Sequence, residues 1–526
     1  MVTVPRAADE QVTRAAGVVG GATFLSRILG YVRDAVIAWL FGTSASADAF
    51  FVAFRIPNLL RRMFAEGSLG VAFVPVFTET LHKKGRAEAL RLAQAALLSL
   101  SGLLAAVAVL GVACAPEIVG LVGPGFKDDP ALFNLTVELT RIMFPYIFFI
   151  GLVALSMGIL NVFGHFAAPA LAPVVLNLSI IGAALVVSPH LERPVVGLAV
   201  GVLAGGALQL LLQLPFLYRF GAGFGGRMVF FHDGLKKVGR LMVPAAFGAA
   251  VYQINLLINT QLATLLPQGS VSYLYYADRL VQFPLGIIGL AAATALLPSL
   301  SRQALTDDRA AVTRTFGHSA RITLFLTIPA MCGLLLLREP IIWLLFQRGA
   351  FDLAAVRLTA AALLYYGAGL WAFTLARLAA QIFYALQDTR TPVWTAAVSI
   401  ATNIAVGVTC MRFMGHVGLA LATTVASGVN VVLLLTAMRS KLGPLGMGEI
   451  FKSAARSLGC ALVMCAGIML LRPRIGGGES PEVLTVVAGL GLAIAGGMLF
   501  YFVMARLTRA PELAALVNAV KARRQG

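Results

Sequence analysis

Long apolar runs dominate the chain, and short segments that carry charge, proline or glycine separate them. A membrane-spanning α-helix needs about 20 mainly apolar residues, so the runs between these breaks predict fourteen spanning helices. They cover residues 17–42, 48–77, 92–115, 133–160, 168–188, 195–218, 240–265, 271–300, 316–337, 353–382, 392–411, 416–438, 453–471 and 483–505. Charges interrupt the first, second and eighth of these segments. The pattern predicts an all-α polytopic membrane protein.

The composition agrees with this pattern. Of the 526 residues, 59% are hydrophobic and 12% are charged, whereas a soluble domain has about 45–50% apolar and about 25% charged residues. Such a chain lacks the polar surface of a soluble enzyme, a disordered scaffold or a disulfide-rich secreted protein. The five cysteines lie in apolar runs and form no C-x-x-C pair, which argues against a disulfide framework or a metal site. The N-terminal residues 1–16 show no cleavable signal pattern.

The positive charge is distributed unevenly between the loops. The formal net charge is +18. With the N-terminus inside, the inner segments carry 23 of the Lys and Arg residues and the outer segments carry 7. An excess of basic residues marks cytoplasmic loops, so we expect both termini in the cytoplasm. The same loops explain the net charge without a nucleic-acid partner.

The two halves of the chain resemble each other at a nearly constant offset in the sequence. Residues 69–75 match 292–298, and Pro169 falls opposite Pro392. An offset that covers an even number of spans keeps the orientation, so the repeat is parallel. Folds of this kind place a substrate site between two halves that rock against each other.

The repeat predicts four regions along the chain. They are an N-terminal lobe of six spans at 1–218, a cytoplasmic linker at 219–239, a C-terminal lobe of six spans at 240–438, and two extra spans with a basic cytoplasmic tail at 439–526.

Charged residues recur at helical spacing within the first two predicted spans. In the first span, Arg27, Gly30 and Asp34 share one face, and Arg33 lies beside it. In the second span, one face holds Arg55, Asn58, Arg62 and Glu66, and Arg61 lies beside it. Asp48 lies at the start of the second span, and the eighth span adds Asp278, Arg279 and Gln282. A charge at the middle of a bilayer costs about 3 kcal/mol on insertion scales, so these groups need partners or water.

Arginine outnumbers carboxylate in these three spans. Six arginines face four carboxylates, so two guanidinium groups remain even if every carboxylate pairs with one arginine. Arginine binds phosphate and carboxylate in a planar, bidentate way, which favours a wet cavity for a phosphate-bearing ligand. The alternative is structural: Arg27 with Asp34, and Arg62 with Glu66, could form pairs within one helix, or Arg61 and Arg62 could contact lipid headgroups.

Three of these segments, residues 26–34, 48–67 and 275–284, resemble the MurJ (MviN) family of lipid II flippases in peptidoglycan synthesis. The resemblance extends over nearly the whole chain. It implies the MOP exporter superfamily fold, a bacterial cytoplasmic (inner) membrane location, and a cationic cavity for the diphosphate and sugar of an undecaprenyl-linked precursor. It also implies a lipid-tail groove at the last two helices.

The resemblance also implies a set of substrate-binding residues. The functional arginines of the family map onto Arg27, Arg33, Arg61 and Arg279, its other charged positions match Asp34, Asp48 and Glu66, and Arg55, Asn58, Arg62 and Gln282 lie within the matching motifs. Some relatives have Glu in place of Gln282, so no acidic role carries over there. The residues Gln253, Asn255, Asn259, Thr402 and Asn403 lack a carboxylate, which argues against the sodium site of some relatives.

These observations favour a transporter over an enzyme. We expect the chain to move lipid II to the outer leaflet by alternating access, as a monomer among membrane lipids, without a cofactor and with its cell-wall synthesis partners unidentified. A related exporter of another polyprenyl-diphosphate oligosaccharide is the alternative. A glycosyltransferase or phosphatase would need a catalytic constellation, and His232 and Asp233 in the longest internal loop supply none. No P-loop is present.

Overall fold

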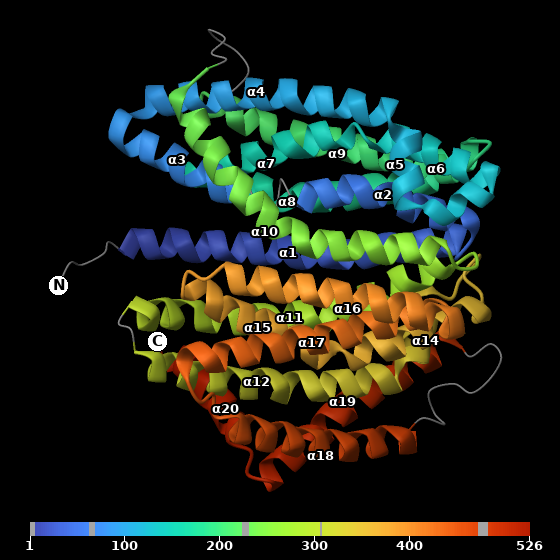
Figure 1. Ribbon diagram of the computed structural model, residues 1–526, viewed down its shortest axis with the longest axis vertical. Coiled ribbons are helices and arrows are strands. Elements are labelled where there is room, and N and C mark those ends of the chain that lie inside the picture. Colours follow the sequence, from blue (N-terminus) through green and yellow to red (C-terminus); the bar gives the residue numbers. More distant parts are fainter. Residues whose placement is uncertain (1–5, 63–68, 223–230, 306–307, 472–481, 526) are drawn as a thin grey trace. The chain divides into compact units, whose positions relative to one another are not determined.

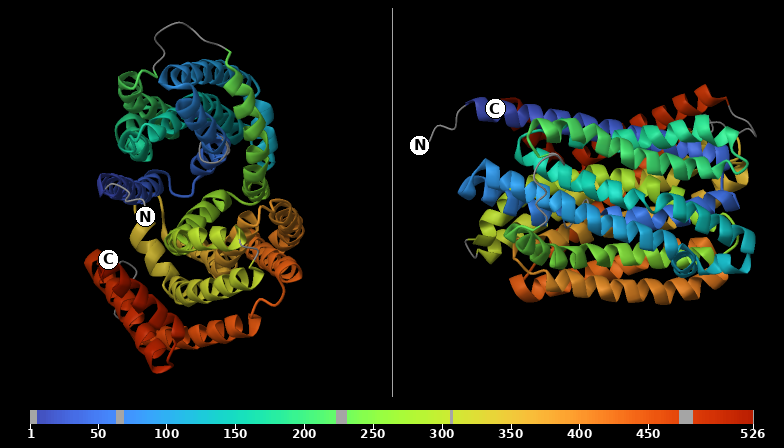
Figure 2. Two further views of the ribbon diagram at one scale, coloured as in Figure 1. Left: turned by 90° about the vertical axis from the view of Figure 1, so that its left-hand side faces the viewer. Right: turned by 90° about the horizontal axis from the view of Figure 1, so that it is seen from above.

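The computed structural model describes residues 6–62, 69–222, 231–305, 308–471 and 482–525. These described residues form helices and turns and include no strand. They divide into two compact units, Met1–Ser272 and Tyr273–Gly526. Within each unit most helices lie side by side in roughly one direction, and α10 and α20 run obliquely to them (Figures 1 and 2).

The first unit contains ten α-helices and three short helical segments in its described part. They are α1 (Arg6–Phe41), α2 (Ala45–Arg61), α3 (Leu69–Lys84), α4 (Arg86–Ala113), α5 (Ala115–Val122), η2 (Pro124–Asp128), α6 (Pro130–Met143), α7 (Tyr146–Val162), α8 (Ala167–Gly182), η3 (Ala183–Val187), η4 (Ser188–His190), α9 (Val195–Arg219) and α10 (Asp233–Thr264).

The second unit contains the remaining helices of the described chain. They are α11 (Ser270–Leu305), α12 (Arg309–Leu336), α13 (Arg338–Phe346), α14 (Leu353–Ala368), α15 (Leu370–Ala385), α16 (Arg390–Met414), α17 (His416–Leu442), α18 (Met447–Leu471), α19 (Val483–Leu507) and α20 (Pro511–Gln525). The boundary between the units falls inside the first turn of α11. The first unit therefore includes α10, and the predicted grouping of spans into lobes stays a prediction.

The helices confirm the predicted all-α polytopic class. In the described residues, nine helices are long and apolar enough to cross a membrane, or ten if α14 and α15, which are bent by 42° at their junction, form one span. These ten coincide with ten of the fourteen predicted segments. Helices α1, α2 with α3, α10 and α11 occupy the other four. The first, second and eighth segments are the charged ones, and the count of fourteen stays a prediction.

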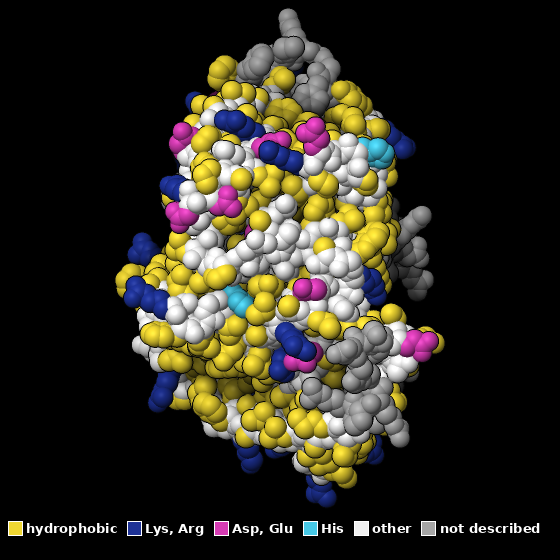
Figure 3. All heavy atoms as spheres, turned by 90° about the vertical axis from the view of Figure 1, so that its right-hand side faces the viewer, with side chains coloured by type: hydrophobic (Ala, Val, Ile, Leu, Met, Phe, Trp, Pro, Cys, Tyr) yellow, Lys and Arg dark blue, Asp and Glu magenta, His cyan; other side chains and the backbone are white. Residues whose placement is uncertain are grey.

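Large apolar side chains are exposed on the surface of both units. Leu470 is 83% exposed, Phe413 84% and Val109 69%. Figure 3 shows one face of the described residues, where hydrophobic side chains prevail and charged ones form scattered groups. Exposed apolar surface of this extent is expected for helices whose solvent is hydrocarbon.

The bounds of several helices follow the offset of the predicted internal repeat. Helices α4 and α12 both have 28 residues, and their first residues, Arg86 and Arg309, are separated by the same offset as residues 69–75 and 292–298. Helices α6 and α14 begin at this offset too, and each has an aspartate as its N-cap residue. The Asp129 carboxylate accepts from the amide of Leu132 at 3.1 Å, and that of Asp352 accepts from Ala355 at 2.7 Å. A carboxylate at this position satisfies amides that the first helical turn leaves without partners.

A tight turn repeats at the same offset. Gly164, after α7, has φ = 78°, and Gln387, after α15, has φ = 58°. Their amides donate to the carbonyls of Asn161 and Tyr384, respectively. Glycine adopts this left-handed conformation without strain, whereas glutamine does not. The second repeat thus keeps a backbone geometry that its sequence does not favour.

Candidate functional site

Arg33 and Asp34 form a buried pair on α1. Arg33 is 8% exposed and Asp34 is fully buried. The guanidinium Nε and Nη2 donate to Oδ1 of Asp34 at 3.0 and 2.7 Å, and Nη1 donates to Oδ1 of Asn177 on α8 at 3.1 Å. Asn177 Nδ2 in turn donates to the carbonyl of Ser26 at 3.0 Å. The pair therefore joins α1 to α8 and fixes the orientation of Arg33.

This arrangement differs from one pairing that helical spacing had suggested. Arg27 and Asp34 share a helix face, but Asp34 binds its neighbour Arg33. The side chain of Arg27 is exposed, one to two turns away. Within the described ranges, neither Arg27 nor Arg62 forms an ion pair.

Asp48 lies near the start of α2 and is 3% exposed. Its Oδ2 accepts from the amide of Gly269 at 2.7 Å, and its Oδ1 accepts from the amide and the hydroxyl of Ser272 at 2.9 and 2.5 Å. These groups belong to the turn before α11 and to its first residues. Asp48 therefore holds the N-terminus of α11 against α2, within the first unit.

The other polar residues of α2 lie in its second half. Pro57 is buried inside the helix and has no N–H, so it leaves a backbone carbonyl one turn earlier without its helical donor. Arg61 donates through Nε and Nη2 to Oδ1 of Asn58 at 3.2 and 3.0 Å, and Arg55 and Arg62 are half-buried. Helical spacing had placed Arg61 beside the face of Asn58, and the two side chains are in contact. Glu66 lies outside the described residues.

The predicted residues of α11 lie in the second unit. Gln282 donates through its amide to the carboxylate of Asp278, one helical turn earlier. Tyr276 is fully buried, and its ring centroid lies 4.9 Å from that of Phe346 and 5.3 Å from that of Phe351. This packing sets the rotation of α11 and leaves Asp278, Arg279 and Gln282 half-buried. The predicted set therefore divides between the units, with Arg279 and Gln282 in the second.

In the first unit, charged side chains outside the apolar segments connect the ends of α3, α4 and α10. Lys83 and Lys237 both donate to the carboxylate of Glu79, and the hydrogen bond from Lys237, with that from Lys83, lowers the pKa of Glu79 from 4.5 to about 2. His232 Nδ1 accepts from the amide of Gly234, so we assign the proton to Nε2, which donates to Glu88 at 3.1 Å. This hydrogen bond lowers the pKa of Glu88. Helix α10 is thereby joined to α3 and α4.

The second unit has a comparable pair at the turn before α16. Lys441 at the end of α17 donates to the carboxylate of Asp388, and so does the hydroxyl of Thr391, at 2.6 Å. Desolvation raises the pKa of Asp388, but the hydrogen bonds from Lys441 and Thr391 outweigh it and lower that pKa from 3.8 to about 2. The pair fixes the α15–α16 turn to α17.

Three partners of the site escaped sequence reasoning. The side-chain amide of Asn177 accepts from Arg33 and orients it, and Gly269 and Ser272 donate to the carboxylate of Asp48. Asn177 was visible as a single amide within an apolar segment. Gly269 and Ser272 carried no such signal. In the described residues, no group of three or more His, Cys, Asp or Glu side chains is arranged to hold a metal ion.

Comparisons with known proteins give one consistent result. A family model described as lipid II flippase MurJ matches residues 37–479. A relative from Vibrio cholerae, named probable lipid II flippase MurJ, is 43% identical over 425 residues, which cover 79% of this chain and 81% of the relative. A relative from Burkholderia cenocepacia, named lipid II flippase MurJ, is 42% identical over 433 residues, which cover 81% of this chain and 84% of the relative.

Two solved structures are similar to the chain as a whole. The structure titled lipid II flippase MurJ, inward closed conformation, has a TM-score of 0.78 at 27% identity, and the match covers 93% of this chain and 98% of that one. An inward-facing multidrug resistance transporter of the MATE family, in the MOP superfamily, has a TM-score of 0.67 at 15% identity, covering 82% and 99%. The second likeness shows a shared fold alone.

Proposed function

The chain belongs to the MurJ family of lipid II flippases, and on this premise we propose that it carries lipid II from the cytoplasmic to the outer leaflet of the membrane by alternating access. The family match over residues 37–479, together with the arginines of α1, α2 and α11, is the observation that carries the proposal. Lipid II has a diphosphate in its headgroup, and guanidinium groups are suited to hold a diphosphate by paired hydrogen bonds.

The contacts of the carboxylates support an anionic ligand. Asp34 receives two hydrogen bonds from Arg33, and both oxygens of Asp48 accept from the turn that precedes α11. These two carboxylates therefore act as positioning groups in our proposal. The diphosphate would be received by Arg27, Arg61 and Arg279, with Arg55 and Arg62 beside them and Glu66 balancing charge.

Arg33 has a distinct place in the proposed site. Its guanidinium is held by Asp34 on its own helix and by Asn177 on α8. A side chain fixed from two helices is preorganised, so it loses little conformational entropy when a ligand arrives. We propose that Arg33 orients α1 and adds positive potential, while the exposed Arg27 contacts the phosphate.

No covalent chemistry is part of this cycle. Neutralisation of the arginines by the headgroup would let the two lobes close on one side and open on the other, while the lipid tail stays in the bilayer. Outward movement of negative charge gains about 2.3 kcal/mol per charge per 100 mV of an inside-negative potential. In this proposal the membrane potential contributes free energy to the outward movement of the headgroup.

The proposal also includes the orientation of the chain in the membrane. In this proposal both termini lie in the cytoplasm, and residues 1–218 and 240–438 form the two lobes. The basic loops support this orientation through the positive-inside rule. We place the protein in the bacterial cytoplasmic membrane as a monomer.

Complementation tests this function. In a rod-shaped bacterium depleted of its own flippase, this chain should restore growth and shape. Arg27→Ala and Arg279→Ala should lose rescue at normal membrane levels, because each removes a phosphate-binding group. Arg193→Ala is the matched control, since Arg193 is exposed and pairs with Glu138 on the surface. Full rescue by a triple alanine variant of Arg27, Arg61 and Arg279 would refute the proposed site.

A further inference from the structure

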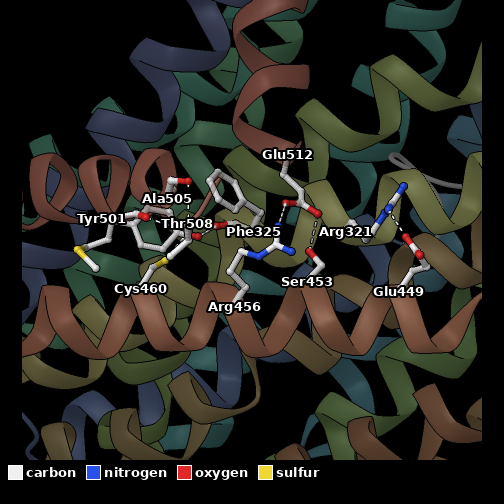
Figure 4. A network of polar contacts seen from close by, with 11 residues as sticks. Arg321, Phe325, Glu449, Ser453, Arg456, Cys460, Tyr501, Ala505, Thr508 and Glu512 are labelled. Carbon is white, nitrogen blue, oxygen red and sulfur yellow. Dashed lines mark hydrogen bonds and ion pairs between the residues drawn. The ribbon is translucent and has the colours of Figure 1, made fainter. Parts of the chain in front are cut away.

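Helix α12 carries a proline in its interior, and the consequence is visible on α19. Pro329 has no N–H, so the carbonyl of Phe325, four residues earlier, lacks its helical donor. The hydroxyl of Tyr501 on α19 donates to that carbonyl at 2.7 Å. Tyr501 is 2% exposed, and its ring centroid lies 5.1 Å from that of Phe325 (Figure 4). In an apolar medium each backbone group must find a partner, so this hydrogen bond is costly to lose.

The internal repeat supplies a natural control. Helix α4 is the repeat equivalent of α12, and it has Ala106 where α12 has Pro329, and Leu98 where α12 has Arg321. The outward surface of α4 carries large apolar side chains that are more than half exposed: Leu103, Val109 and Leu110, at 57%, 69% and 63%. The proline and the arginine are thus found only in the repeat against which α18 and α19 pack.

Helix α18 also makes polar contacts with α12 and α20. Arg321 of α12 pairs with Glu449 of α18 at 2.9 Å. Glu512 of α20 is 4% exposed; it accepts from the hydroxyl of Ser453 at 2.8 Å and lies 3.8 Å from Arg456, both on α18. Figure 4 shows these residues in a row with Tyr501. Polar contacts therefore join α18 and α19 to α12, and α20 to α18.

Apolar packing surrounds the central hydrogen bond. Phe325 and Ile328 of α12, Met464 and Ile468 of α18 and Tyr501 of α19 belong to one buried cluster. Apolar contact alone does not select between helices in lipid, because lipid tails are as apolar as the side chains. The hydrogen bond from Tyr501 to the carbonyl of Phe325 is directional, and it joins α19 itself to α12.

We propose that Tyr501 is a positioning residue: by satisfying the carbonyl that Pro329 releases, it fixes α18 and α19 to α12, so that this C-terminal pair moves as part of the second unit. The choice of α12 over its repeat equivalent α4 follows from the proline. The consequence for transport rests on the proposed function. The attachment itself is a property of the second unit and holds independently of the substrate.

A double-mutant cycle tests the attachment. Tyr501→Phe keeps the ring but leaves the carbonyl without a donor, and it should lower the melting temperature of the purified protein by about 2 °C. Pro329→Ala returns an N–H to the helix. The melting temperature of the double variant should therefore be almost the same as that of Pro329→Ala. If Tyr501→Phe lowered the melting temperature equally in the unaltered chain and in Pro329→Ala, the proposal would be overturned.

Two further readouts separate positioning from general stability. Hydrogen–deuterium exchange of α19 should rise in Tyr501→Phe and return towards the Pro329→Ala level in the double variant. The initial rate of lipid II transport into vesicles should fall in Tyr501→Phe and return towards the Pro329→Ala rate in the double variant. Tyr218→Phe is the matched control, because Tyr218 is 54% exposed. Unchanged exchange in α19 would refute the attachment. Absence of lipid II transport by the unaltered chain would refute the proposed function and leave the cycle as an independent test.

Discussion

At the scale of single residues, Asp34 is the most deeply buried carboxylate of the charged set on α1 and α2. Replacement by Asn keeps the shape but removes the charge to which Arg33 Nε and Nη2 donate. Loss of one partner of a buried pair costs about 3 kcal/mol, because the remaining charge is poorly compensated. We expect Asp34→Asn to lower the free energy of unfolding by this amount, measured by thermal unfolding in detergent.

A surface pair provides the control for this prediction. Glu138 pairs with Arg193 at 2.9 Å, but their side chains are 44% and 61% exposed. Water and salt screen such a pair, so Glu138→Gln should cost about 0.5 kcal/mol or less. Equal losses in the two variants would contradict the structural role of the Arg33–Asp34 pair.

The residues of the site were predictable to different degrees. Helical spacing and motif resemblance identified the arginines and carboxylates, because those signals lie within one segment. The partners of Asp48 follow it only much later in the chain, in the turn before α11, and Asn177 lies on α8, far in sequence from Arg33 on α1. Such contacts depend on how helices pack. No local pattern encodes that packing.

At the scale of helices and turns, the repeated turn gives a test with opposite outcomes in the two units. Gln387 is exposed and has φ = 58°. Gln387→Gly should raise the stability by about 0.5 kcal/mol, because relief of a left-handed strain of roughly 1–2 kcal/mol exceeds the added backbone entropy of roughly 0.4–1 kcal/mol. Differential scanning fluorimetry of the purified protein measures the change.

The reverse substitution belongs at the equivalent position of the first unit. Gly164 has φ = 78°, and a Cβ there would meet no atom within 4 Å. Gly164→Ala should therefore lower the stability by about 0.5 kcal/mol, because the backbone strain exceeds the loss of entropy in the unfolded chain. Changes of the same sign in both variants would show that the two turns are not equivalent.

The α15–α16 turn also predicts a pH dependence. The pKa of Asp388 is about 2 in the folded chain and 3.8 ordinarily. A lowered pKa stabilises the folded state above pH 3.8, and this contribution disappears as the pH falls through about 2. Lys441→Met should therefore lower the melting temperature at pH 6, and the difference from the unaltered chain should shrink between pH 4 and pH 2. A difference that stays constant with pH would assign the effect of Lys441 to packing.

Helices were the most predictable part of the chain. Ten predicted segments coincide with helices that can cross a membrane, because long apolar runs determine them directly. The internal breaks were harder to foresee. One predicted segment comprises α6 and α7, and another comprises α14 and α15 with a bend of 42°.

At the scale of the whole molecule, the repeat explains most of the architecture and its departures carry specific information. Helices α4 and α12 keep the same length, and α6 and α14 keep the same aspartate cap. Pro329 in place of Ala106 marks the repeat that carries the additional helices. The sequence displayed both residues, but the meaning of the difference required the contact between Tyr501 and Phe325.

The central claim is that arginines of α1, α2 and α11 receive the diphosphate of lipid II. The most direct measurement is the initial rate of transport of labelled lipid II by purified protein in vesicles, compared with that of a folded variant in which Arg27, Arg61 and Arg279 are alanine. Each lost charge-assisted hydrogen bond is worth about 1.5–3 kcal/mol, so the rate should fall by about tenfold or more. A rate equal to that of the unaltered protein would contradict the account.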